Sequence, residues 1–269
     1  MSGTFWSPRY ALLAVACGVL GLAVGSFLNV VIHRVPRKES VVAPRSRCPE
    51  CDHPLAARDN VPIVSWLLLR GKCRECGTPI SIRYPAVELA TAALFVAGAL
   101  RFGASWDLPA YLVLFASLLA ISAIDLELYI IPNRIVYPTI AIALPLLAMA
   151  AAAQHRWEPL QHALIGGAGA WTVLFVAHVA SGGRGMGFGD VRLAFILGLF
   201  LGWLDPYPYG HVFLGLFLGF ALGSVVGLAL MGLRLRTRKD HIPFGPFLAG
   251  GTVLAIFVGS PILTAYFGR

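Results

Sequence analysis

The chain has 269 residues, of which 58% are hydrophobic and 13% are charged, and its mean hydropathy is +0.76. This composition excludes an ordinary soluble domain, in which about half of the residues are apolar. The formal net charge of +8 is spread over loops between apolar segments, which does not suit a nucleic-acid-binding surface. We therefore expect an all-α polytopic membrane protein that contacts lipid and has no nucleic-acid partner.

Eight apolar segments are predicted to cross the membrane, for which a helix needs about 20 residues. The first lacks a basic leader and a small-residue cleavage site, so we expect a retained helix rather than a signal peptide. The second and the sixth are short. The predicted spans are Tyr10–Ile32, Pro85–Leu100, Leu108–Ile124, Ile135–Ala153, Leu160–Ala180, Val191–Leu204, His211–Leu233 and Phe244–Phe267.

The distribution of basic residues predicts the orientation, because cytoplasmic loops carry an excess of Lys and Arg. If the amino terminus lies outside, 17 of the 21 Lys and Arg residues fall in inner segments and 4 in outer segments. Both termini are then outside. The expected organisation is a first transmembrane helix (1–32), a cytoplasmic segment (33–84) and a seven-helix membrane core (85–269).

The polar segment 33–84 contains two CxxC pairs separated by 21 residues. Each pair can chelate one face of a tetrahedral ion, so the four cysteines Cys48, Cys51, Cys73 and Cys76 predict a structural zinc site. Disulfides or free thiols are the alternatives, and a reducing cytoplasm disfavours disulfides. His53 follows the first pair and is expected to be a bystander.

Two acids at the edges of apolar runs are the candidate catalytic residues. Asp125 ends the run 111–124, and Asp190 follows the glycine-rich segment GMGFG and opens another run. A carboxylate at the hydrocarbon boundary is costly and is functional by default, and a carboxylate pair can activate water for hydrolysis. We expect Asp190 to be the charged base and Asp125 the protonated partner, although a coupled pair can exchange these roles. Glu127 competes with Asp125 but lies on another helix face.

Other polar residues near the inner ends of the spans are expected to be structural. Asn29 and His33 could line a polar cavity, but they are expected to satisfy helix ends or neighbouring backbone. Glu88 is expected to be a favourable first-turn acid of the second span. The sequence contains no Walker-type phosphate loop.

Several sequence blocks, in order, resemble bacterial type IV prepilin peptidases. They are GSFLNVVIHRVP (25–36), the two CxxC pairs, DNVPIVSWLLLRGKC (59–73), RYPAVEL (83–89), the segment from Asp125 to IIPN, GMGFGDVRLA and IPFGPFLA (242–249). The resemblance covers nearly the whole chain and is carried by many blocks, which makes it more specific than any single motif.

The resemblance implies a membrane-embedded aspartic protease of the bacterial inner membrane, with Asp125 and Asp190 in the positions of the catalytic pair. The implied substrates are prepilins and pseudopilin precursors, whose basic leader stays in the cytoplasm while the following apolar helix lies in the membrane. Cleavage would occur at the cytoplasmic face. Many family members also methylate the new amino terminus with S-adenosylmethionine, and the zinc-binding domain accompanies that second activity. No feature of this sequence identifies the S-adenosylmethionine contacts.

Two residues depart from the family pattern, and two other functions compete with the protease. Asn133 stands where many members have aspartate, and Arg192 where lysine is frequent.

A proton- or ion-coupled transporter would use the same aspartates but predicts inverted repeats, which the sequence does not show. A non-enzymatic assembly factor would use the cysteine segment as a docking platform.

Overall fold

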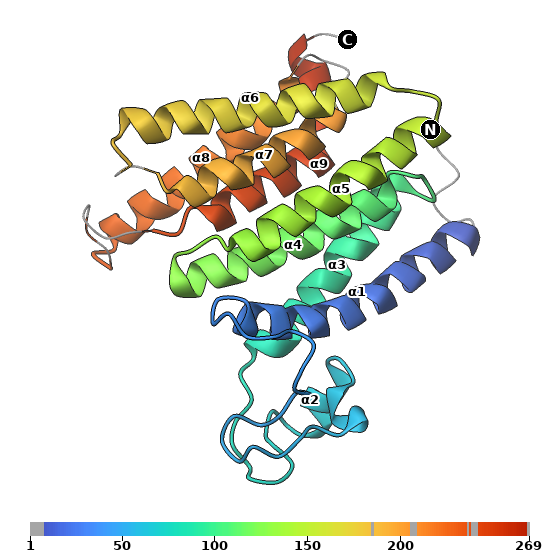
Figure 1. Cartoon of the computed structure of the whole chain (residues 1–269), viewed down its shortest axis with the longest axis vertical. Helices are drawn as coiled ribbons and strands as arrows, with labels where there is room; N and C mark the ends of the chain where they lie inside the picture. Colours follow the sequence, from blue (N-terminus) through green and yellow to red (C-terminus); the bar gives the residue numbers. More distant parts are fainter. Residues whose placement is uncertain (1–7, 184–185, 205–208, 236, 238–241, 268–269) are drawn as a thin grey trace. The chain divides into compact units, whose positions relative to one another are not determined.

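The computed structural model describes residues 8–183, 186–204, 209–235, 237 and 242–267 (Figure 1). In that part of the chain the secondary structure is helical, with two isolated β-bridges and no strand, so the expected all-α architecture is confirmed. The long helices are α1 (Pro8–Arg34), α3 (Arg83–Phe102), α4 (Leu108–Leu128), α5 (Asn133–Ala153), α6 (Glu158–Ala180), α7 (Phe188–Trp203), α8 (Gly210–Gly232) and α9 (Gly245–Phe267). The polar segment holds two short helices, η1 (Ala57–Asn60) and α2 (Val64–Leu68).

Each predicted span corresponds to one long helix. Among the described residues, seven helices are long and apolar enough to cross a membrane, and α7, with 16 residues, is the remaining one. Large apolar side chains on the outer faces of these helices are exposed, such as Leu12 at 71% and Phe213 at 73%. Exposed apolar side chains on a helix of this length are expected to face lipid.

The chain forms two compact units, residues 1–120 and 121–269. In the first unit α1 packs along α3, and glycines let the two backbones approach closely. A Cβ on Gly21 would lie 2.6 Å from Ala92 Cα, and one on Gly25 would lie 2.7 Å from Glu88 Cα. Small residues at such contacts are typical of helix packing in membranes, where close van der Waals contact replaces the hydrophobic effect.

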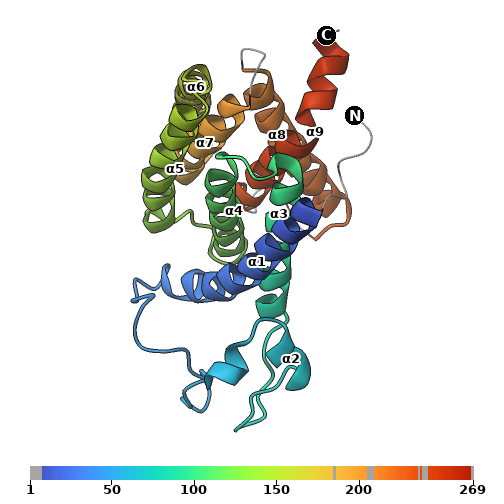
Figure 2. The same ribbon diagram turned by 90° about the vertical axis from the view of Figure 1, so that its right-hand side faces the viewer.

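The second unit is built around α7, which contacts α5, α6, α8 and α9 (Figures 1 and 2). Glycines again sit at the closest approaches: a Cβ on Gly198 would collide with the carbonyl oxygen of Gly166 on α6. Between α8 and α9, a Cβ on Gly251 would collide with the backbone nitrogen of Gly219. The short α7 is therefore enclosed by longer helices, and its first turn carries Asp190.

Candidate active site and candidate metal centre

Asp190 lies in the first turn of α7, where the chain leaves the glycine-rich segment. Its Oδ2 accepts a hydrogen bond from the backbone N–H of Gly187 at 3.1 Å, and the side chain is buried. A carboxylate at the third position of a helix satisfies an N–H that has no partner in the helix and interacts favourably with the helix dipole. The sequence predicted this placement at a helix start.

Asp125 lies near the end of α4 and is also buried. Its Oδ2 accepts a hydrogen bond of 2.9 Å from the backbone N–H of Gly245, the first residue of α9 and 120 positions away in the chain. A second helix N-terminus therefore supports this carboxylate, a contact that the sequence reasoning missed. Glu127, the competing acid two residues on, is exposed.

The side chain of Ile131 lies beside Gly189, which precedes Asp190, and beside Gly245, which donates to Asp125. A Cβ on Gly189 would lie 3.0 Å from Ile131 Cβ, and a Cβ on Gly245 would lie 3.4 Å from Ile131 Cδ1 and 2.8 Å from Asp125 Oδ2. The charge of Asp125 also acts on Asp190 electrostatically. The end of α4 and the starts of α7 and α9 therefore converge, and they bring together the two acids that the sequence had singled out.

The arrangement of these acids suits the activation of water. In the described part of the chain, Oδ2 of each acid accepts one backbone N–H, so the other carboxylate oxygen can contact a water molecule or a substrate. Two carboxylates close enough to interact do not ionise together easily, so one tends to hold a proton while the other acts as a base. A base and an acid side by side are what hydrolysis by water requires.

The two residues that depart from the family pattern contact each other. Arg192 Nη1 donates a hydrogen bond of 2.6 Å to Asn133 Oδ1, across from α7 to α5. The guanidinium also lies over the ring of Phe188, 4.4 Å from its centroid. Because Asn133 is neutral, this contact orients the cation without neutralising it.

The four predicted cysteine ligands are together in the first unit. Their Sγ atoms all lie within 4.8 Å of one another, and those of Cys48 and Cys76 are 3.8 Å apart. A zinc–sulfur bond of about 2.3 Å in a tetrahedron separates neighbouring sulfurs by about 3.8 Å. The same distance is far beyond the disulfide length of about 2.05 Å, and all four cysteines are free. The donor set therefore fits a metal ion, and His53 lies outside it.

The backbone around the two pairs is folded in the same way twice. Cys48 N–H donates to His53 O at 3.0 Å, and Cys73 N–H donates to Thr78 O at 2.8 Å. A β-bridge encloses each pair, between Arg47 and Pro54 and between Lys72 and Pro79. Two matching turns present their thiols toward each other, which is how two pairs make one tetrahedral site.

Thr78 prepares one of the thiols for metal binding. Cys76 Sγ lies 3.3 Å from Thr78 Oγ1. Hydrogen bonds to the side chain and the backbone of Thr78 lower the pKa of Cys76 to about 6. Since the thiolate is the metal-binding form of cysteine, this contact favours Cys76 as a ligand.

An ion pair braces the second cysteine pair. Arg74 donates to both carboxylate oxygens of Asp59, with the shortest contact, from Nη2 to Oδ1, at 2.6 Å. The hydrogen bonds and charge of Arg74 hold the pKa of Asp59 below its usual range. The Asp59 side chain is only 9% exposed, against 73% for Asp52, which pairs with Arg47 beside the first pair.

Polar contacts in this unit also join the cysteine segment to α3, and α1 to α3. Glu88 Oε2 accepts the N–H of Ile63 at 2.7 Å, and Asn29 Nδ2 donates to Tyr84 O at 3.1 Å. The expectation that Glu88 is a first-turn acid is wrong, because α3 starts at Arg83 and puts Glu88 in its second turn. Asn29 satisfies neighbouring backbone, as expected.

Two family models match the chain. The bacterial Peptidase A24 N-terminal domain matches residues 19–102, which include the cysteine segment, and the type IV leader peptidase family matches residues 112–232, which include both aspartates. No match to a solved structure was found.

Similar proteins are named prepilin leader peptidase/N-methyltransferase. The one from Stutzerimonas stutzeri is 37% identical, over 92% of this chain and 91% of the relative. The Aeromonas hydrophila protein is 35% identical over the same shares, and the Pseudomonas putida protein is 34% identical over 96% of this chain and 95% of the relative. The similarity thus extends over both units.

Proposed function

Because this chain belongs to the type IV leader peptidase family, we propose that it is a membrane-embedded aspartic endopeptidase that cleaves prepilins and pseudopilin precursors. The cut removes the short basic leader, after which the new amino terminus is methylated. The observation that carries the proposal is the convergence of Asp125 and Asp190, each held by one backbone N–H. Neither the family matches nor the similar proteins support a transporter.

In the proposed reaction, one carboxylate removes a proton from water, and the water oxygen attacks the scissile carbonyl carbon. The other, protonated carboxyl hydrogen-bonds to the carbonyl oxygen, and a proton then passes to the leaving amine as the peptide bond breaks. We assign the base to Asp190 and the acid to Asp125, with the proton shared between them during turnover. The mechanism forms no covalent acyl-enzyme.

The proposed location is the bacterial inner membrane, with both termini outside and the aspartates facing the cytoplasm. The described helices that are long and apolar enough to cross a membrane support a membrane location. The 17 basic residues in the inner segments support the orientation, because cytoplasmic loops carry an excess of Lys and Arg. This orientation also puts the aspartates on the side where the leader of the precursor lies.

We propose that the four cysteines hold structural zinc. Four thiolates complete a tetrahedral shell and leave no position for a catalytic water, so the ion would stabilise the segment rather than take part in cleavage. S-adenosylmethionine is the proposed methyl donor, because the similar proteins are named as N-methyltransferases.

Mass spectrometry of a prepilin-like precursor tests the proposal. Wild-type protein in proteoliposomes should shorten the precursor by its leader, and S-adenosylmethionine should add the mass of a methyl group to the product. Asp190→Asn should give no product. Glu127→Gln, which changes the exposed neighbouring acid, should cut normally. Normal cleavage by inserted Asp190→Asn protein would leave the transporter and the assembly factor standing.

A further inference from the structure

The short helix α2 of the cysteine segment exposes an apolar face. Val64, Leu67 and Leu68 lie within about 100° of one another around the helix axis, at 3.6 residues per turn, and all three are exposed, Leu68 at 78%. Ser65 and Trp66 are on the other side, where Ser65 is buried. Because contiguous exposed apolar surface marks an interaction site, a partner is expected on this apolar face.

Two hydrogen bonds fix the other side of α2 beside the beginning of α3 (Figure 2). Trp66 Nε1 donates to the carbonyl oxygen of Ile80 at 3.1 Å, and the N–H of Ile63, the residue before α2, donates to Glu88 Oε2 at 2.7 Å. Glu88 lies three residues inside the predicted span Pro85–Leu100, or about 4.5 Å along the helix axis. A helix joined to a membrane helix at this depth lies at the membrane boundary.

The turn that leads into α2 is strained, and the contact with α3 holds it. Ile63 has φ 59° and ψ −51°, and the N–H of Val64 donates to the carbonyl oxygen of Pro62 at 2.5 Å across it. This is the rare kind of γ-turn, and a β-branched residue seldom adopts a positive φ. Strained backbone persists only where its surroundings hold it, here through the bond from Ile63 to Glu88. Specific contacts therefore fix the orientation of α2.

The residues around α2 carry positive charge. Arg70 and Lys72, which we call the basic pair, follow the apolar face directly and are exposed. Between Asp59 and Glu75 the chain has no acidic residue. An apolar helix face beside basic residues is typical of helices that lie in the membrane interface, where the basic side chains attract anionic lipid.

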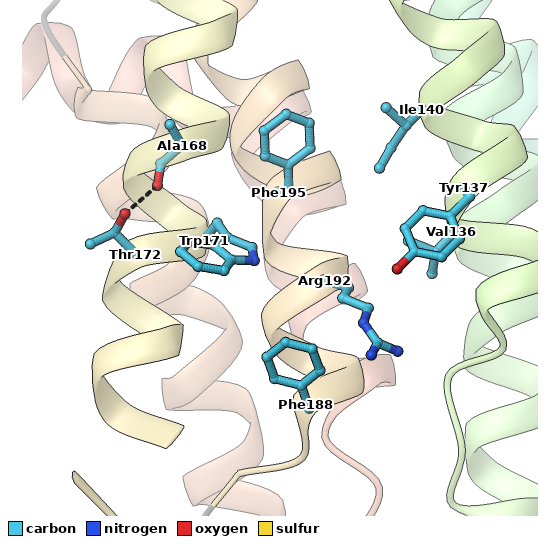
Figure 3. Close-up of a pocket in the computed structure, with 9 residues that line it drawn as sticks. All are labelled: Val136, Tyr137, Ile140, Ala168, Trp171, Thr172, Phe188, Arg192 and Phe195. Carbon is cyan, nitrogen blue, oxygen red and sulfur yellow. Dashed lines mark hydrogen bonds between the residues drawn. The ribbon is translucent and has the colours of Figure 1, made fainter. Parts of the chain in front are cut away.

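The second unit has apolar rings and a cation at helix ends that are predicted to be cytoplasmic (Figure 3). Tyr137 on α5, and Phe188 and Arg192 on α7, lie within the first two turns of their helices and line a pocket of about 580 Å³. Aromatic side chains with a nearby cation are typical of the membrane–water interface. In the first unit α2 supplies apolar and basic side chains of this kind.

We propose that α2 is an interfacial helix, whose apolar face enters the cytoplasmic surface of the bilayer and whose basic pair binds anionic lipid headgroups. The bilayer is favoured over a protein partner because the contact with Glu88 holds α2 at the membrane boundary, where lipid is the neighbour. The cysteine cluster, which begins its second pair five residues after Leu68, is then held beside the membrane. The inference requires only that α3 crosses the membrane and does not depend on the proposed cleavage.

Photocrosslinking in proteoliposomes tests the contact with lipid. Benzoylphenylalanine replaces Leu68 in the full-length protein, in vesicles of equal parts phosphatidylglycerol and phosphatidylcholine, and mass spectrometry identifies the adducts. We expect mainly lipid adducts, with phosphatidylglycerol favoured roughly fivefold, the size expected for one basic side chain near an anionic surface. The same probe at Glu50, an exposed residue of the same segment, is the control and should give few lipid adducts. An unchanged unfolding temperature checks that each labelled protein is folded.

A second variant separates charge from apolar contact. In the Leu68 probe protein, Arg70→Gln combined with Lys72→Gln should bring the two lipids to equal yields and keep the lipid adducts, because the apolar face is intact. Arg45→Gln, which changes an exposed basic residue elsewhere in the segment, should keep the preference for phosphatidylglycerol.

Three results would overturn the inference. One is a Leu68 probe that reacts mainly with protein, either another part of this chain or an added precursor, and another is an equal yield of lipid adducts at Leu68 and Glu50. The third is a phosphatidylglycerol preference that survives removal of the basic pair.

Discussion

Replacing Gly245 by alanine should displace the side chain of Asp125, the proposed catalytic acid, without unfolding the protein. The added Cβ would lie 2.8 Å from Asp125 Oδ2, whereas ordinary contacts begin near 3.4 Å. The carboxylate must therefore move by about 0.6 Å, which disturbs the 2.9 Å hydrogen bond from Gly245 N–H. Since a misplacement of about 1 Å can lower a rate about 100-fold, we expect kcat to fall roughly 10- to 100-fold.

Steady-state cleavage of a prepilin-like precursor measures this effect, with thermal unfolding in detergent as the test of folding. KM should change little, because the added methyl group displaces only the Asp125 carboxylate, and alanine should not weaken the helix. Gly250→Ala is a matched control on α9, because its Cβ would lie 3.5 Å from Leu222 Cδ1, an ordinary contact. A wild-type kcat in Gly245→Ala would refute the view that Gly245 positions Asp125 for the reaction.

Three further changes test the packing and the metal site. Gly198→Ala should lower the free energy of unfolding by about 1–3 kcal/mol, because its Cβ collides with α6; Gly169→Ala, which points into open space, should not. Cys48→Ser should lose zinc, measured by elemental analysis, while Cys17→Ser on α1 should keep it. Asp59→Asn should speed zinc release to a chelator at pH 7 about two- to fivefold, because the pair with Arg74 is formed above the lowered pKa of Asp59 and lost as pH falls through it. Equal release rates would contradict that role.

Local sequence signals predicted the helices and the cysteine cluster well. In a membrane, the backbone of an apolar segment must form its hydrogen bonds within the segment, as a helix does. Composition and length alone therefore locate such spans. The sixth span can be shorter, because most residues of α7 are buried by the surrounding helices. Two CxxC pairs define a tetrahedral donor set through their spacing.

Contacts between distant segments could not be predicted in the same way. The sequence indicated which residues lie at helix ends, but it could not say which ends meet. Gly245 lies inside the predicted span Phe244–Phe267, but nothing near it in the sequence indicated that its N–H supports Asp125, 120 positions away. The pairing of Asn133 with Arg192 and of Glu88 with Ile63 depends likewise on how helices pack. The one local signal for Gly245 was a glycine before proline at the start of an apolar run, which marks a helix N-terminus.

The rates of three variants test most directly whether the two aspartates act as one unit. Asp125→Asn, Asp190→Asn and the double variant should insert normally and share the same residual cleavage rate, at least about 10³-fold below wild type, because removing either member disables the pair. Losses that multiply in the double variant, or a single variant that keeps nearly the wild-type rate, would contradict the account.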